Sequence, residues 1–120
     1  MQRILIVEDD PNLRVVIRMV PERVGYEVAE ARHGVAALES IEKDPPDLVI
    51  ADMRMPMMDG VELMDRIRTN PETASMPIVL LSGLQVDAAA ERLATAVVAK
   101  PFEPADLLAG IARSLQGGGR

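Results

Sequence analysis

The chain has 120 residues, the length of one folded domain, and its 48% hydrophobic and 27% charged residues are the balance of a globular protein. Its 13 lysines and arginines against 19 aspartates and glutamates give a net charge of -6, so we expect no direct binding of nucleic acid. The absence of cysteine excludes disulfides and thiolate chemistry, and the lack of a membrane-spanning apolar run or signal peptide leads us to expect a cytoplasmic protein without a membrane partner.

Strand-like and helix-like segments alternate along the first half of the chain. Residues 4–7 form a continuous apolar run, which is typical of a strand buried on both faces. Apolar residues at helical spacing follow at Leu13, Val16, Ile17 and Val20. We expect Pro21 to kink or shorten this helix, because proline removes a backbone hydrogen bond. The segment Glu27–Ala31 alternates like an edge strand, a helical stripe follows, and residues 48–51 form the next continuous run.

The same alternation continues to the end of the chain. Residues 78–81 and 97–99 are two further apolar runs, typical of buried strands. The remaining helical stripes are Val35, Leu38 and Ile41, then Leu63, Met64 and Ile67, and finally Leu107, Leu108, Ile111 and Leu115. Helix starts are indicated by Asp10 before Pro11, by Asp59 three residues before Glu62, and by Pro104.

Five successive strand–helix units predict an open, doubly wound α/β domain, in which a five-stranded parallel sheet carries helices on both faces. We place this domain at residues 1–116 and expect residues 117–120 to form a flexible, glycine-rich tail. Ligands bind such sheets beyond the carboxyl ends of the strands. The functional residues should therefore follow the apolar runs.

Charged and polar side chains do follow these runs. They are Glu8, Asp9, Asp52, Ser82 and Lys100. Two carboxylates about 5 Å apart, such as Asp9 and Asp52, would repel each other by about 3 kcal/mol at an effective dielectric of about 20, so the pKa of one would rise or the pair would recruit a metal ion. Oxygen donors favour Mg²⁺, with Mn²⁺ as the alternative. Asp52 could then attack a phosphoryl group whose oxygens contact Lys100 and Ser82.

Four motifs together resemble the receiver domain of two-component response regulators. They are Glu8-Asp9, the run DMRMPMMDG that begins at Asp52, Leu81-Ser82-Gly83, and Lys100-Pro101-Phe102. The resemblance covers essentially the whole chain and implies a flavodoxin-like strand order 2-1-3-4-5. It also implies that a sensor histidine kinase or a histidine phosphotransfer protein phosphorylates Asp52 in a Mg²⁺-dependent reaction.

Further properties follow from the same resemblance. Mg²⁺ would be held by Asp9, Asp52 and the main-chain carbonyl of Arg54, with Glu8 often acting through water. The chain would be a phosphoacceptor that assists its own phosphorylation and dephosphorylation, not an enzyme. It would signal by conformational change to a downstream protein effector, as a monomer or a phosphorylation-dependent dimer. The peptide bond between residues 100 and 101 would be cis.

The sequence departs from the family on the surface to which Ser82 and Lys100 would report the phosphoryl group. The position three residues before Lys100 is usually aromatic in the family and is Val97 here. Residues 85–95 leave a fourth helix about one turn shorter than usual. One alternative is therefore a pseudo-receiver that acts only as a docking module. Another is a small Mg²⁺-dependent phosphohydrolase with an aspartyl-phosphate intermediate.

Other residues receive more local interpretations. Met53, Met55, Met57 and Met58 are expected to fill gaps in the core rather than to bind copper. The single histidine, His33, is expected to be a solvated surface residue. Arg54 and Leu84 occupy positions at which the family tunes dephosphorylation. Their side chains are expected to shield the phosphoryl group and slow its loss.

Overall fold

A computed structural model describes residues 2–83 and 87–117 of the chain. Its five parallel strands form one sheet in the order β2-β1-β3-β4-β5. The strands are β1 Arg3–Val7, β2 Glu27–Ala31, β3 Leu48–Asp52, β4 Ile78–Ser82 and β5 Ala96–Ala99. Each predicted strand is present within one residue of its expected bounds, and the predicted strand order is confirmed.

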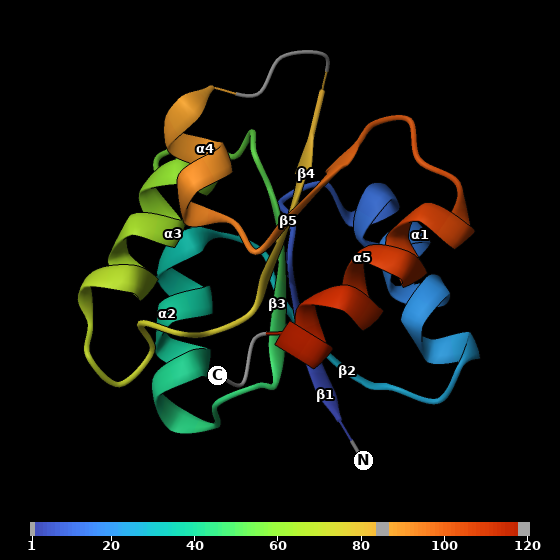
Figure 1. Ribbon diagram of the computed structural model, residues 1–120, viewed down its shortest axis with the longest axis horizontal. Helices are drawn as coiled ribbons and strands as arrows, with labels where there is room; N and C mark the ends of the chain where they lie inside the picture. Colours follow the sequence, from blue (N-terminus) through green and yellow to red (C-terminus); the bar gives the residue numbers. More distant parts are fainter. Residues whose placement is uncertain (1, 84–86, 118–120) are drawn as a thin grey trace.

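The helices lie in two layers, one on each face of the sheet. Their bounds are α1 Pro11–Arg23, α2 Gly34–Lys43, α3 Gly60–Thr69, α4 Ala88–Leu93 and α5 Pro104–Gly117. Figure 1 shows the sheet nearly edge-on, with α2, α3 and α4 on one side and α1 and α5 on the other. This arrangement confirms the doubly wound α/β prediction.

Successive strand residues point to opposite faces, so the sheet builds two apolar cores. In β1, Leu5 and Val7 pack on the side of α2 and α3, whereas Ile4 and Ile6 pack on the side of α1 and α5. All four side chains are at most 1% exposed. Strands covered on both faces in this way need no polar alternation, which is why the sequence shows continuous apolar runs.

The first turns of α1 and α3 follow the predicted caps, and His33 and Asp87 cap α2 and α4. Asp10 Oδ1 accepts from the amide of Asn12 at 2.9 Å, and Asp59 Oδ1 accepts from the amide of Glu62 at 2.9 Å. His33, expected to be a solvated surface residue, instead caps α2. Its Nδ1 accepts from the amide of Ala36 at 3.0 Å. Histidine is not among the usual cap residues, so this contact could not be predicted from residue type.

The helices show details that the sequence did not indicate. Helix α1 runs through Pro21 and ends two residues later, so the buried proline lies inside its last turn. Val16 and Val35 were assigned to core-facing stripes, yet they are 52% and 49% exposed. The helical stripes expected from the sequence are wider than the faces that the sheet covers, and within these stripes Ile17 and Ile41 are buried.

The C-terminal end of the domain lies slightly beyond its predicted position. Helix α5 continues through Gly117, one residue into the segment expected to be a tail, and residues 118–120 lie outside the described residues. Helix α4 has 6 residues, in accord with the short fourth helix expected from the sequence. Within the described ranges, no helix has the length and apolar character needed to cross a membrane.

Candidate functional site

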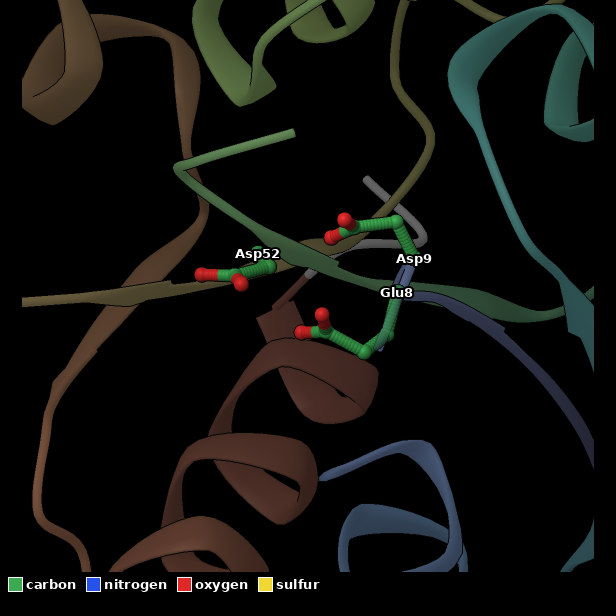
Figure 2. Close-up of side chains that lie close together, drawn as sticks. All are labelled: Glu8, Asp9 and Asp52. Atoms are coloured by element: carbon green, nitrogen blue, oxygen red, sulfur yellow. The ribbon is translucent and has the colours of Figure 1, made fainter. Parts of the chain in front are cut away.

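The parallel register brings three strand ends to one edge of the sheet. Val7 pairs with Ala51 in β3, and Asp52 pairs with Leu81 in β4. The residues that follow β1 therefore lie beside the last residue of β3. Figure 2 shows the carboxylates of Glu8, Asp9 and Asp52 directed toward a common space. Each offers a carboxylate oxygen that lies within 4.8 Å of the others.

The other predicted site residues line a cavity at the same edge. Its volume is about 950 Å³, and Asp52, Arg54, Ser82 and Lys100 are among its lining residues. Lys100 reaches the site because its amide donates to the carbonyl of Ser82 at 2.7 Å, which extends the pairing of β4 with β5 by one step. Residues far apart in the sequence are thus brought together as predicted.

Asp52 is held next to a cation in a mostly buried position. Its side chain is 5% exposed, and Lys100 Nζ lies 2.6 Å from Asp52 Oδ1. The Lys100 side chain is 29% exposed and lines the cavity together with Asp52. A positive charge in this place compensates the carboxylate and can also contact an anion that approaches it.

Glu8 is buried without an opposite charge of its own. Only 1% of its surface is exposed. Burial first, and then the neighbouring Asp52 carboxylate, raise its pKa to about 8, because burial disfavours the charged form and Asp52 disfavours a second negative charge beside it. The amide of Asp10 donates to Glu8 Oε2 at 3.0 Å and acts in the opposite direction. Within the part of the chain that the structure describes, the buried Glu8 Oε1 has no hydrogen-bond partner.

These properties fit a hard divalent cation. Three carboxylate groups converge, all their donors are oxygens, and one buried oxygen has no partner. Mg²⁺ prefers such donors and commonly binds through one or two carboxylates while keeping several waters. A cation between the carboxylates would also remove the repulsion that raises the pKa of Glu8.

The loop from β3 to α3 turns sharply beside the site. Asp59 is followed by Gly60, whose amide donates to the carbonyl of Met53 at 2.8 Å. A Cβ on Gly60 would lie 2.8 Å from the carbonyl oxygen of Asp52, so only glycine fits at this position. The cis bond between Lys100 and Pro101, expected from the family, is present.

One methionine of this loop does not fill the core. The amide of Met58 donates to the carbonyl of Pro56 at 2.7 Å across Met57, whose φ is 69°. This tight turn directs Met58 inward, where its sulfur leaves no room for a Cβ on Gly34. Met57 is left 88% exposed, in contrast to the core-filling role expected for it. Met55 and Met58 are buried as predicted.

Two further points concern residues around the site. Arg14 was not among the predicted site residues, yet its guanidinium donates to the carbonyl of Glu8 at 2.8 Å. No motif distinguished it from the other arginines of the first helix. Leu84, which was expected to shield the phosphoryl group, lies outside the described residues. The side chain of Arg54 is exposed at the cavity.

The chain is similar to known proteins over most of its length. The family model of the response regulator receiver domain matches residues 4–112. The chain is 34% identical over 104 residues to sporulation initiation phosphotransferase F of Bacillus subtilis, covering 85% of this chain and 84% of that protein.

Two further similarities agree with this match. The chain is 36% identical over 112 residues to the transcriptional regulatory protein CseB of Streptomyces coelicolor, covering 90% of this chain but 47% of that protein. This chain therefore spans about half the length of that regulator. The solved signal receiver domain of a signal transduction histidine kinase from Syntrophus aciditrophicus matches with a TM-score of 0.88 at 30% identity, covering 98% and 92% of the two chains.

Proposed function

The chain belongs to the response regulator receiver domain family of two-component signal transduction, and we propose that Asp52 is its phosphoacceptor. The observation that carries this proposal is the convergence of Asp52, two further carboxylates and Lys100 at one edge of the sheet. Among the three acids, Asp52 is the one in contact with the Lys100 ammonium. It also lines the open cavity, from which a phosphoryl donor can approach.

The proposed reaction transfers a phosphoryl group from a phosphohistidine. An oxygen of Asp52 attacks phosphorus, the phosphorus–nitrogen bond breaks, and the imidazole leaves with the electron pair, so an acyl phosphate forms on Asp52. Lys100 compensates negative charge on the phosphoryl oxygens, because its ammonium already lies beside Asp52. The hydroxyl of Ser82, on the neighbouring strand, donates a hydrogen bond to the phosphoryl group.

Mg²⁺ is the proposed cofactor, with Mn²⁺ able to occupy the same donors. Asp9, Asp52 and the main-chain carbonyl of Arg54 would hold it, and Glu8 would act through water. Bound there, the cation supplies positive charge that lets an anionic donor approach a carboxylate. Exposed Asp9 and buried Glu8 each offer a carboxylate oxygen within 4.8 Å of one from Asp52, which supports this assignment.

The proposed donors are a sensor histidine kinase or a histidine phosphotransfer protein. The proposed target is a downstream protein effector that recognises the change made by Ser82 and Lys100 around the new phosphoryl group. The chain would assist its own phosphorylation and dephosphorylation and would act as a monomer or a phosphorylation-dependent dimer. The net charge of -6 argues against a direct nucleic-acid partner.

Phosphorylation by acetyl phosphate tests the assignment of Asp52. With Mg²⁺ present, we expect the wild-type chain to gain the mass of one phosphoryl group and Asp52→Asn to gain none. Asp10→Asn is the matched control, because asparagine keeps the α1 cap and Asp10 is an exposed acid next to the site. Labelling of Asp52→Asn at the wild-type rate would show that another residue is the nucleophile.

The same experiment separates the alternatives. A pseudo-receiver that acts only as a docking module would take no label and would show no response to Mg²⁺. A phosphohydrolase would turn over an external phosphomonoester continuously instead of stopping after one phosphoryl group per chain. We expect at most one phosphoryl group per chain and no hydrolysis of the phosphomonoester.

A further inference from the structure

Arg14 connects the acidic edge of the sheet to the edge strand β2. Its Nη1 donates to the main-chain carbonyl of Glu8 at 2.8 Å, and its Nε donates to Glu30 Oε1 at 2.8 Å. Two nitrogens of the planar guanidinium thus donate to different segments, and the Arg14 side chain is only 19% exposed. Glu30 lies in β2, whereas Glu8 follows β1, so one side chain of α1 contacts the ends of two strands.

The carbonyl of Glu8 belongs to the peptide group that joins Glu8 to Asp9. It stands one residue beyond Val7, the last residue of β1 that is paired in the sheet register. The amide side of Glu8 is fixed by a bond to the carbonyl of Ala31 at 3.1 Å. The bond from Arg14 fixes the carbonyl side. Because the peptide group is planar, its orientation sets the direction in which Asp9 leaves the strand.

We propose that Arg14 is a positioning residue for the metal-binding acids, acting on Asp9 through the Glu8 carbonyl. This inference rests on the proposed Mg²⁺-dependent function. Arg14 contacts neither the carboxylate of Asp9 nor that of Asp52 in the bonds described, so its effect is exerted through the backbone. Groups that orient metal ligands from outside the coordination sphere can strongly affect metal affinity.

Arg18 offers a matched comparison within the same charge network. It lies one turn further along α1, forms an ion pair with Glu30 as Arg14 does, and donates to Glu22 Oε2 at 2.8 Å. Among the described residues, only Arg14 joins this network to the Glu8 carbonyl. Both arginines carry one positive charge and pair with Glu30, and the contact with the Glu8 carbonyl is what separates them.

The charge and the contact of Arg14 predict opposite effects on Mg²⁺ binding. Loss of a positive charge near the acids would attract a divalent cation more strongly, so charge alone predicts tighter binding in variants of either arginine. Loss of the bond to the Glu8 carbonyl would loosen the peptide before Asp9 and weaken binding in the Arg14 variant only. The sign of the change therefore distinguishes positioning from simple electrostatics.

The test compares Arg14→Met with Arg18→Met, because methionine keeps the apolar stem and removes the charge in both. Mg²⁺ is titrated into each variant and into the wild type while amide NMR shifts are followed, and urea unfolding measures stability. We expect the dissociation constant for Mg²⁺ to rise about tenfold in Arg14→Met. In Arg18→Met it should stay within about twofold or fall.

A dissociation constant for Mg²⁺ in Arg14→Met that is no higher than in Arg18→Met would overturn the inference and leave the proposed function intact. A wild-type chain that binds no Mg²⁺ would overturn both. Should Arg14→Met fail to fold, Arg14→Lys with Arg18→Lys as its control gives the same comparison at constant charge. An ammonium lacks the two-sided fork, so weaker Mg²⁺ binding in Arg14→Lys alone is the expected result.

Discussion

At the scale of single residues, the site is defined by carboxyl groups placed where charge is costly. Glu8 is 1% exposed and lies against Asp52, which is itself buried. Asp52 has Lys100 beside it, whereas Glu8 has one backbone amide and an oxygen without a partner. A negative charge on Glu8 is therefore poorly compensated, and the pKa of Glu8 is raised.

Glu8 should make the stability of the metal-free protein depend on pH. Burial first, and then Asp52, raise its pKa from 4.5 to about 8, so the folded state binds this proton more tightly than the unfolded state. The stabilisation is complete below about pH 4.5 and is lost as the pH rises toward 8. The slope can reach about 1.4 kcal/mol per pH unit.

Urea unfolding in EDTA at several pH values between 5 and 8 measures this effect. Glu8→Gln keeps the shape and cannot ionise, so we expect its free energy of unfolding to fall less than that of the wild type over this range. Asp10→Asn serves as the control and should keep the wild-type slope. Parallel curves for Glu8→Gln and the wild type would contradict the assignment of a raised pKa to Glu8.

At the scale of elements, α3 is fixed at both ends by contacts that reach other segments. Its start lies against β3, because Gly60 approaches the Asp52 carbonyl and the Met53 backbone too closely for a side chain. Near its end, Arg68 donates to the carbonyls of Leu93 and Met76 at 3.0 and 2.6 Å. The first contact shapes the loop of the site, and the second ties α3 to the end of α4.

Replacement of Gly60 should destabilise the fold. In Gly60→Ala the new Cβ would lie 2.8 Å from a backbone oxygen, which cannot move aside as a flexible side chain could. We expect a loss of about 2 to 3 kcal/mol in the free energy of unfolding, measured with urea. Gly83→Ala is the control, since nothing lies within 4 Å of its added Cβ, and it should change stability by less than about 1 kcal/mol. Equal effects would refute the close-packing argument.

Arg68 should contribute more to stability than its neighbour Arg66. Arg68→Met would leave the carbonyls of Leu93, Met76 and Ala74 without this donor, and we expect a loss of about 2 to 4 kcal/mol. Arg66 pairs with Glu62 on the exposed surface of the same helix, so Arg66→Met should cost less than about 0.5 kcal/mol. Thermal and urea unfolding of both variants would measure the difference.

At the scale of the whole molecule, the acidic edge forms only when the strands pair in the sheet, because no single segment contains all of its residues. The acids come from β1 and β3 and the ammonium follows β5, while both apolar cores hold these strands in register. An unfolded chain does not keep these groups together. Binding of a cation at this edge is therefore linked to global stability.

Mg²⁺ should raise the free energy of unfolding of the whole chain. At a concentration ten times its dissociation constant, the gain is about 1.4 kcal/mol for one site that the unfolded state lacks. Asp9→Asn should lose most of this gain and still fold, because Asp9 is exposed and outside both cores. An equal Mg²⁺ effect in Asp9→Asn and the wild type would remove Asp9 from the metal site.

Much of this molecule could be predicted from its sequence because the determining patterns are local. Continuous apolar runs identified β1, β3, β4 and β5, alternation identified β2, and Asp10 and Asp59 identified helix starts. The acids and Lys100 were placed together because each follows a run whose carboxyl end meets the same edge of a parallel sheet. Backbone geometry and burial act over a few residues, so the sequence carries this information directly.

Only the tertiary structure decided the contacts between segments. His33 became a cap, Met57 turned outward, and Arg14 reached Glu30 and the Glu8 carbonyl, because these outcomes depend on how neighbouring elements meet. The raised pKa of Glu8 likewise depends on burial beside Asp52, 44 positions further along the chain. The sequence thus determined the elements and the kinds of group at their ends, and packing in three dimensions determined the partner and the electrostatic environment of each group.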